Sequence, residues 1–298
     1  MPIKKELLER IQEKKKRLAQ MRPLPKDVMK RLREELRLLH TYHSNAIEGN
    51  TLTLQETKLI LEQGITVGGK SLQEHLEATN TADAYKFIEE LAKGKRHIAH
   101  ETIQEIHAIV TRGILADPGK YRITNVRIVG AIKTPPDYTK VAKLMDELFE
   151  TLKKSKYDPI SMAALLHHGI VAIHPFIDGN GRVARLVTNL YLTQHGYPPI
   201  VLRKEDRKKY YGALKKADQD DPGAFINFIA KAVDEALTFY LSASGGDDEL
   251  LPLGELAKTS PYSQEYLSLL ARQGKLDAIK IDGVWHASRR ALRRYTLV

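Results

Sequence analysis

Residues 174–185 read HPFIDGNGRVAR, and they connect two segments with helical character. The first segment, AALLHHGIVAI, ends at His174, because Pro175 cannot continue a helix. Two glycines then flank Asn180 in a tight turn, and a second helix is expected over residues 182–195. The backbone N–H groups at the start of a helix are free, and glycines let a ligand approach them closely. The stretch therefore predicts an anion-binding turn at a helix N-terminus.

Four side chains at this turn have the chemistry of a nucleotide site. Arg182 and Arg185 lie three residues apart, so both can face one anion, and two arginines beside a helix N-terminus suit a polyphosphate. Asp178 offers hard oxygen ligands for a Mg²⁺ ion that bridges phosphates, and His174 is a titratable base beside that site. A base without a protein nucleophile predicts group transfer from a nucleotide to an incoming hydroxyl. Three other histidines are expected to be structural: His43, His167 and His168.

The composition of the 298 residues excludes several classes of protein. Hydrophobic residues make up 42% and charged residues 28%, which is typical of a globular chain and excludes a mostly disordered one. The absence of cysteine excludes disulfides, thiolate zinc sites and cysteine nucleophiles. No apolar run reaches the ~20 residues that span a bilayer, and the charged N-terminus lacks the apolar stretch of a signal peptide. We therefore expect a cytoplasmic protein without a membrane partner.

The net charge of +10 is concentrated at the two ends of the chain. Residues 1–40 carry 13 Lys/Arg against 6 Asp/Glu, and residues 268–298 carry 7 against 2. A basic end can bind nucleic acid, or it can be the solvated face of a helix. Within residues 1–40, glutamates stand three or four positions from lysines and arginines, as in surface ion pairs. We therefore expect a solvated face there.

Hydrophobic periodicity predicts a mainly α fold. Residues 121–134 differ, because they are rich in β-branched residues and precede two prolines, which indicates a short β-hairpin or extended flap. The polar, Gly-rich stretch 242–249 is typical of a linker. We expect three domains: an N-terminal helical region over 1–95, a core over 96–242 and a small unit over 250–298. Helices are expected over residues 3–20, 26–44, 53–62, 71–93, 99–113, 139–154, 159–173, 182–195, 205–217 and 224–241.

The last 49 residues, 250–298, have a pattern of their own. Their elements are three helices and one hairpin with an Asp-Gly turn, expected over 253–257, 263–273, 288–295 and 279–285. This pattern is similar to the helix-turn-helix or winged-helix units of excisionase-like and MerR-like proteins. Two uses stay open: DNA binding, and protein docking or dimerisation with Trp285 as the core anchor. In the DNA alternative, Ser263, Gln264 and Tyr266 face the major groove, and Arg272, Lys275 and Lys280 contact phosphates.

The stretch HPFIDGNGRVAR resembles the signature of the Fic family, H-x-F-x-D/E-G-N-G-R-x-x-R, at every defined position. The resemblance covers residues 40–240 and implies a Fic-type helical bundle. Fic enzymes mostly transfer AMP from ATP to a Ser, Thr or Tyr hydroxyl of a target protein. By this resemblance His174 is the base, Phe176 anchors the loop in the core, and Asp178 holds Mg²⁺. The phosphates are bound by Gly179, Asn180, Gly181 and Arg182, and the γ-phosphate by Arg185.

Two further segments resemble Fic relatives. One is the hairpin that clamps the target segment by strand addition and lies over the nucleotide. Its residues here are Val129, Gly130, Ala131 and Ile132. The other contains Tyr210 and Tyr211, at the place where relatives contact the adenosine. Asp218 stands where relatives often carry asparagine, and an aspartate can accept a hydrogen bond from the adenine amino group but cannot also donate one.

Residues 44–50, SNAIEGN, match the inhibitory pattern of the family, S/T-x-x-x-E-G/N. In this interpretation Glu48 pairs with Arg185, the residue that the γ-phosphate needs, and its carboxylate repels a triphosphate. The alternative is an ordinary helix end with Gly49 as the terminator. In some relatives the equivalent glutamate also positions a water that removes AMP from a modified target. De-AMPylation is therefore a second expected activity.

Two alternatives to AMP transfer stay open. The chain could be a DNA-binding regulator with a sensory nucleotide site, or a Fic enzyme that uses UTP or CDP-choline or transfers phosphate, because the motif residues contact phosphates rather than the base. The expected partners are a target protein, which includes the chain itself, DNA through the C-terminal unit, and a second copy in a homodimer.

Overall fold

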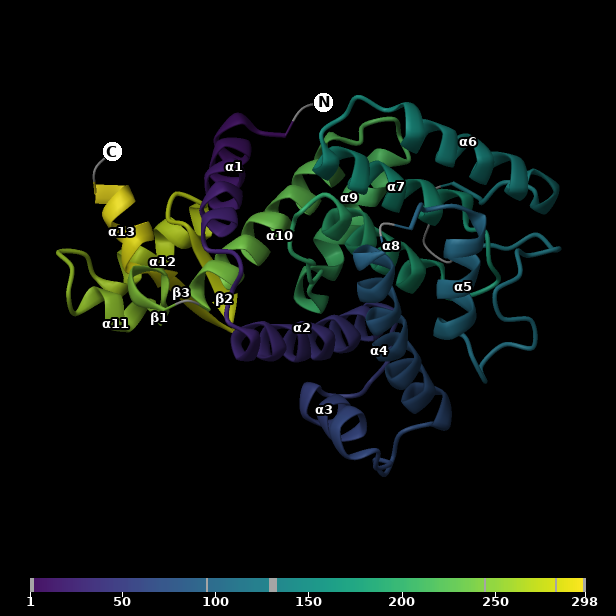
Figure 1. Ribbon diagram of the computed structural model, residues 1–298, viewed down its shortest axis with the longest axis horizontal. Helices are drawn as coiled ribbons and strands as arrows, with labels where there is room; N and C mark the ends of the chain where they lie inside the picture. Colours follow the sequence, from purple (N-terminus) through teal and green to yellow (C-terminus); the bar gives the residue numbers. More distant parts are fainter. Residues whose placement is uncertain (1–2, 95, 129–132, 244, 282, 297–298) are drawn as a thin grey trace. The chain divides into compact units, whose positions relative to one another are not determined.

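The computed structural model describes residues 3–94, 96–128, 133–243, 245–281 and 283–296 (Figure 1). Two compact units are present: one comprises Met1–Lys5 and Glu34–Ala232, and the other comprises Glu6–Arg33 and Val233–Val298. Within the described residues, no helix is both long enough and apolar enough to cross a membrane. The division into three domains stays a prediction.

The larger unit is built around α8 (Asn180–Gln194), most of which is buried. This helix packs against α7 (Pro159–Ile173), α4 (Leu72–Lys93) and α5 (His100–Val110), and Figure 1 shows the four together. The other α-helices with residues in this unit are α2 (Lys26–Ile47), α3 (Leu54–Gln63), α6 (Val141–Lys154), α9 (Arg207–Ala217) and α10 (Gly223–Ser242). The mainly helical fold is confirmed, with helix ends that differ from the expected ones by up to three residues.

The termini of α3 follow the sequence signals closely. The hydroxyl of Thr53 accepts a hydrogen bond from the Glu56 N–H, and the Glu56 carboxylate accepts one from the Thr53 N–H, which forms a capping box. Gly64 ends the helix in the left-handed region, with φ 67°. Thr53 and Gly64 thus act as the N-cap and the C-cap of the helix expected over residues 53–62.

The described residues of the segment expected to form a hairpin flap form a loop. Residues 121–128 and 133–134 carry no strand. The predicted target-contacting residues Val129, Gly130, Ala131 and Ile132 lie outside the described residues. The hairpin and its contacts therefore stay predictions.

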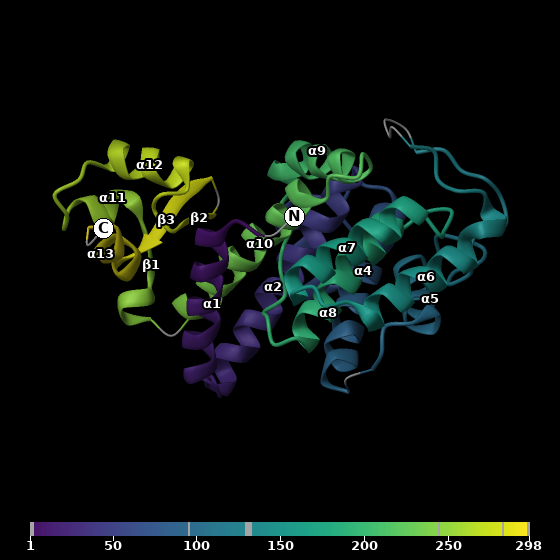
Figure 2. The same cartoon turned by 90° about the horizontal axis from the view of Figure 1, so that it is seen from above.

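The smaller unit combines helices with a three-stranded antiparallel sheet in the order β1-β3-β2 (Figure 2). Its helices are α1 (Lys5–Gln20), α11 (Leu253–Ala257), α12 (Gln264–Gln273) and α13 (Arg289–Thr296), and its strands are β1 (Leu250–Pro252), β2 (Ala278–Ile281) and β3 (Val284–Ser288). The expected hairpin is confirmed, because Ile281 pairs with Val284 and Lys280 with Trp285. The pattern analysis missed β1, a three-residue strand that pairs with β3.

The core of this smaller unit does not centre on Trp285. Its buried side chains are mainly leucines: Leu253, Leu256, Leu267, Leu270, Leu276 and Leu292. Trp285 is only partly buried and packs against this cluster from the side. The expectation that it is the core anchor is therefore wrong, because aliphatic side chains from α11, α12 and α13 already fill the centre.

The stretch 242–249 is not a free linker. Asp248 forms ion pairs with Arg17 and Arg290, and Asp247 forms one with Arg293. Residues 246–248 form a short 3-10 turn. The composition suggested flexibility, but these carboxylates attach the stretch to α1 and α13 of the same unit.

The expectation of a solvated basic face for α1 is also wrong in part. Lys14 is only 3% exposed, and its ammonium donates hydrogen bonds to Asp234, Thr238 and Asp277. Arg10 also donates to Asp234, at 2.7 Å. The basic residues of α1 thus pair with acids far along the chain, which local spacing could not reveal.

Candidate active site

The turn after α7 places His174 in an unusual backbone conformation. Asp158 is the N-cap of α7, and its carboxylate accepts hydrogen bonds from the Ile160 and Ser161 N–H groups. His174 is the C-cap, with φ 52° and ψ 59°. The left-handed region costs a residue with a Cβ roughly 1–2 kcal/mol, so surrounding contacts must hold it there. The His174 Nδ1 lies 3.3 Å from the Val171 carbonyl. Donation from Nδ1–H leaves the Nε2 lone pair as the free base.

The protonation of His174 fits the role of a base. Burial lowers the pKa of His174 below its ordinary value, and Arg122 acts in the same direction, whereas Glu48 and Asp178 oppose it. The imidazole is therefore neutral at pH 7, which is the form that can accept a proton.

The side chain of Asn180 closes the turn. Its Oδ1 accepts a hydrogen bond from the Phe176 N–H, and its Nδ2 donates one to the Phe176 carbonyl, both at 2.9 Å. Phe176 itself is fully buried, as expected for an anchor. Because the Asn180 amide holds the turn through both of its polar atoms, its backbone N–H at the start of α8 is the group best placed to contact a ligand.

α8 begins at Asn180, two residues before the expected start, because Gly179 adopts φ 78° and acts as the N-cap. No side chain caps this N-terminus. A helix end without a cap leaves backbone donors for an anion. The helix start therefore fits the predicted phosphate site.

Two buried arginines complete this site. Arg182 and Arg185 are each 2% exposed, yet Nε and Nη1 of Arg182 and Nη1 of Arg185 have no hydrogen-bond partner among the described residues. Nη2 of Arg182 lies 3.0 Å from Oδ2 of Asp178, and Nη1 lies 3.4 Å from Oε1 of Glu77, an ion pair without hydrogen-bond geometry. Buried unpartnered donors are rare in folded proteins, and a bound anion would satisfy them.

Glu48 follows the end of α2 and reaches this site. Its Oε1 accepts a hydrogen bond from Arg185 Nη2 at 2.7 Å. Ser44 also holds this arginine, through its hydroxyl and its carbonyl, each at 2.8 Å. A Cβ at Gly181 would collide with the Glu48 carboxylate, so this carboxylate lies directly on the first turn of α8. Burial alone would lower the pKa of Arg185, but Glu48 raises it above its ordinary value.

The metal prediction can be tested on the donor set. Asp178 is half exposed and near the turn, but no group of three or more His, Asp or Glu able to hold a metal occurs in the described parts of the chain. Mg²⁺ often binds through one or two carboxylates together with substrate phosphates and water. The residues present therefore fit Mg²⁺ only when a nucleotide supplies the other oxygens.

The predicted adenosine contacts have different environments. Tyr210 is 1% exposed, and its hydroxyl lies 2.8 Å from Nε2 of His167. Tyr211 is 39% exposed, and the Arg207 guanidinium lies over its ring. Asp218 accepts a hydrogen bond from His168 Nε2 at 2.9 Å. Tyr211 is thus the tyrosine that a ligand can reach, while the contacts of all three residues with a nucleotide stay predictions.

The three histidines expected to be structural all have local partners. Nδ1 of His167 lies 2.9 Å from the Thr188 hydroxyl, opposite its contact with Tyr210. His43 accepts a hydrogen bond from the Lys204 N–H, and His168 pairs with Asp218 as described above. Each ring thus has a packing or pairing role that accounts for its position.

Sequence analysis missed two side chains that hold the turn. His107 on α5 donates from Nε2 to the Asp178 carbonyl at 3.1 Å and accepts at Nδ1 from the Gly119 N–H at 2.8 Å. Arg122 donates to the His174 carbonyl. No motif contains either residue, and the hydrogen bonds join positions 71 and 52 residues apart.

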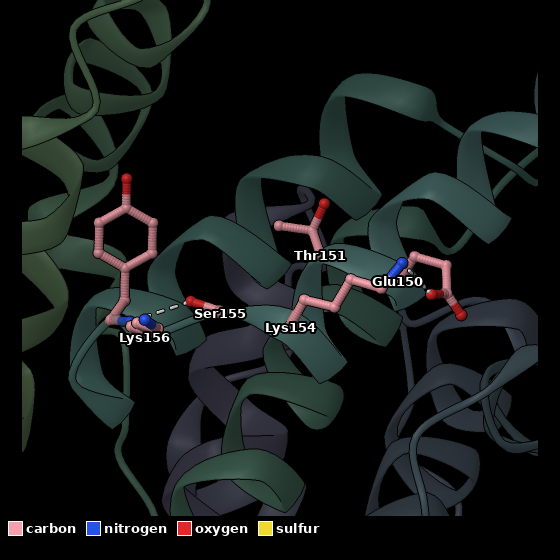
Figure 3. A pocket seen from close by; sticks show the side chains of 6 residues that line it. Glu150, Thr151, Lys154, Ser155 and Lys156 are labelled. Carbon is pink, nitrogen blue, oxygen red and sulfur yellow. Dashed lines mark hydrogen bonds and ion pairs between the residues drawn. The ribbon is translucent and has the colours of Figure 1, made fainter.

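Hollows among the described residues of the larger unit have different linings. One of about 490 Å³ is at the end of α6, with its lining side chains shown in Figure 3. Its residues are Glu150, Thr151, Lys154, Ser155, Lys156 and Tyr157, and none belongs to the turn. Another, of about 10 Å³, lies among His40, Ser44, Arg185 and neighbours and has room for a single water. The side chains suited to bind a nucleotide therefore lie at the turn after α7 and not in the larger hollow.

Comparison with known proteins agrees with this geometry. Residues 97–192 match the Fic/DOC family. The protein adenylyltransferase Fic of Drosophila willistoni is 39% identical over 246 residues, which is 80% of this chain and 48% of that protein. The chain thus spans about half the length of the curated relatives it matches.

Solved structures agree as well. Fic-1 of C. elegans superposes with a TM-score of 0.72 at 32% identity, covering 80% of this chain and 72% of the other. A Fic domain containing signaling protein from Bacteroides thetaiotaomicron gives a TM-score of 0.73 at 29% identity, covering 79% and 97%. The chain belongs to the Fic/DOC family.

Proposed function

We propose that this chain transfers AMP from ATP to a Ser, Thr or Tyr hydroxyl of a protein, and that Glu48 inhibits the reaction. The observation that carries the proposal is the set of unpartnered donors on Arg182 and Arg185 beside an uncapped helix N-terminus. They lie next to a turn that begins with a neutral imidazole. The adenylyltransferase names of the curated relatives support the same activity.

The reaction assigns a role to each group. The oxygen of the acceptor hydroxyl attacks the α-phosphorus of ATP, the bond to the β-phosphate oxygen breaks, and pyrophosphate leaves. Nε2 of His174 takes the hydroxyl proton as the P–O bond forms. The N–H groups of α8 and the two arginines hold the phosphates. Mg²⁺, held by Asp178 and the phosphates, would neutralise charge on the triphosphate.

Glu48 interferes with this arrangement through charge. Its carboxylate occupies the Arg185 guanidinium and lies on the first turn of α8, where the proposed triphosphate would be held. Two anions compete there for one set of donors, so ATP binds without the alignment that transfer requires. Removal of the carboxylate should therefore activate the enzyme.

De-AMPylation is the second proposed activity of this site. The charge of Glu48 raises the pKa of His174 against the effect of burial, so the carboxylate lies within electrostatic range of the imidazole. Such a pair can orient a water toward the phosphorus of a modified hydroxyl. AMP-modified target incubated with wild type and with Glu48→Gln would show this activity as AMP release by wild type alone.

Labelled-nucleotide transfer tests the main proposal. Wild type, Glu48→Gly and Glu48→Gly/His174→Ala would be incubated with ATP, UTP, CTP, GTP and CDP-choline, with the chain itself and a cell extract as acceptors. We expect AMP transfer to rise in Glu48→Gly and to disappear in Glu48→Gly/His174→Ala. If the acceptor is labelled only from another donor, the activity is transfer from that donor and not AMP transfer. If Glu48→Gly labels no acceptor with any donor, the proposal is refuted.

The DNA-binding alternative draws little support from the smaller unit. Three of the four arginines of α13 pair with acids of the same unit: Arg290 with Asp248, Arg293 with Asp247, and Arg294 with Glu13. The Ser263 hydroxyl caps α12, and the Tyr266 hydroxyl contacts that of Tyr295. These groups would have to exchange partners before they could contact DNA. Homodimerisation and a cytoplasmic location stay predictions from the sequence.

A further inference from the structure

Arg122 is buried beside the turn and makes four hydrogen bonds to backbone carbonyls. Its own N–H donates to the Pro175 carbonyl, and its Nε donates to the His174 carbonyl, both at 2.9 Å. Its Nη1 donates to the Thr124 carbonyl at 2.9 Å, and its Nη2 donates to the Pro136 carbonyl at 2.5 Å. Only 3% of the residue is exposed. One arginine thus joins three separate pieces of backbone.

These pieces are the ones whose mutual position matters for the proposed chemistry. The His174 carbonyl belongs to the left-handed residue that carries the imidazole. The other two carbonyls stand at the two ends of the segment 124–136. Because a guanidinium is planar and its donors have fixed directions, it holds all three carbonyls in one geometry.

A purely structural role explains this arrangement poorly. The hydrogen-bond acceptors of the Arg122 side chain are neutral carbonyls rather than a carboxylate. Burying a cation without a paired anion is costly, and apolar side chains of similar volume usually serve stability as well or better. What the guanidinium provides and an apolar residue cannot is the fixed direction of three acceptors.

We infer that Arg122 is a positioning residue, which fixes the backbone of His174 relative to the carbonyls of Thr124 and Pro136 and so orients the imidazole. The inference rests on the proposed function. It assigns no contact between Arg122 and the nucleotide. Misplacement of a reacting group by about 1 Å can lower the rate up to about 100-fold. Loss of the hydrogen bonds from the Arg122 side chain should therefore slow the transfer step.

The test uses the full chain with Glu48→Gly as the active parent. Arg122→Lys keeps the positive charge but, as a point donor, cannot hold three carbonyls. Arg122→Ala removes the side chain. Arg96→Lys, an exposed arginine paired with Glu105, is the matched control. For each variant, kcat, the KM for the acceptor, the Kd for ATP and the melting temperature would be measured.

We expect Arg122→Lys to lower kcat about 10- to 100-fold, with the Kd for ATP within about twofold of the parent. Guanidinium chloride at low millimolar concentration should restore part of kcat in Arg122→Ala but not in Arg122→Lys, whose side chain fills the space. Arg96→Lys should match the parent. If Arg122→Ala does not fold, the kcat and Kd of Arg122→Lys decide the question.

The outcomes separate the inference from the proposed function. No transfer by the parent Glu48→Gly refutes the proposed function itself. An active parent with an equally active Arg122→Lys overturns the inference alone. Joint loss of melting temperature, ATP binding and kcat in Arg122→Lys also overturns it, because that pattern shows a structural role.

Discussion

The imidazole of His107 lies flat on the ring of Phe176, with centroids 3.7 Å apart and planes 2° apart. Both nitrogens of this imidazole are used, one as the acceptor from Gly119 and the other as the donor to Asp178. The stack fixes the position of the phenyl ring, and the donor fixes the peptide before the glycine turn. A residue outside the motif therefore sets the shape of the motif.

Replacement of His107 by phenylalanine should separate these two roles. The stack can persist, but the Gly119 N–H and the Asp178 carbonyl lose their partner. Each buried group left without a partner costs about 1–3 kcal/mol, so for two groups we expect the free energy of unfolding to fall by about 2–6 kcal/mol and transfer to weaken. Urea unfolding measures the first effect. The exposed His97→Phe is the control, and equal stability of the two variants would contradict the prediction.

Ser44 should contribute to inhibition, but less than Glu48 does. Its hydroxyl accepts a hydrogen bond from Nε of Arg185 at 2.8 Å. Loss of one such bond costs about 1 kcal/mol, which shifts the equilibrium away from the inhibited arrangement about fivefold. Initial rates of AMP incorporation should rise by about that factor in Ser44→Ala and further in Glu48→Gln. A Ser44→Ala rate equal to wild type, or above that of Glu48→Gln, would count against this order.

Stability should fall as the solution becomes mildly acidic. Burial lowers the pKa of His40 and of His43 to about 3, and that of His107 to about 4. The unfolded chain binds protons on these residues near pH 6.5, while the folded chain stays unprotonated. Stability is therefore complete above pH 6.5 and is lost progressively as the pH falls, down to about pH 4 for His107 and about pH 3 for His40 and His43, by up to ~1.4 kcal/mol per pH unit for each histidine.

Urea unfolding at pH 7 and pH 5 measures this loss. His43→Gln removes one of the buried histidines. The difference in the free energy of unfolding between pH 7 and pH 5 should therefore shrink by about the contribution of one histidine. The exposed His97→Gln should leave the difference as it is in wild type. The same difference in all three proteins would show that the buried histidines do not control acid stability.

Lys14 should be among the most sensitive positions of the smaller unit. Lys14→Met leaves the buried Asp234 with Arg10 as its remaining side-chain cation, and breaking a buried pair from one side costs about 3–5 kcal/mol. Removal of both charges in Lys14→Met/Asp234→Leu should recover part of the loss. Lys16→Met, on the exposed side of the same helix, serves as the control. Urea unfolding measures these effects. Equal free energies of unfolding for Lys14→Met and Lys16→Met would contradict the prediction.

The features that could be predicted from the sequence depend on neighbours along the chain. The capping box of Thr53 and Glu56 lies within four residues, and so does the Asn180 bond to Phe176 that closes the turn. Such signals are local, because the groups that interact are brought together by a single turn of backbone. They sufficed to place the helices and to predict an anion site at the start of α8.

The features that could not be predicted join distant segments. Lys14 meets Asp234 across 220 residues, and His107 meets Asp178 across 71. A lysine in an amphipathic helix has the same local pattern whether it is solvated or buried, so only the folded chain distinguishes the two. The Glu48–Arg185 pair spans 137 residues and was expected only through resemblance to a family.

His174 has a further consequence for how sequences can change at this turn. With φ 52°, it occupies a position that a residue without a Cβ would adopt more readily. A His174→Gly substitution would relieve this backbone strain, but it would also remove the imidazole proposed as the base for AMP transfer. Backbone stability and the proposed activity thus place opposite demands on this one residue.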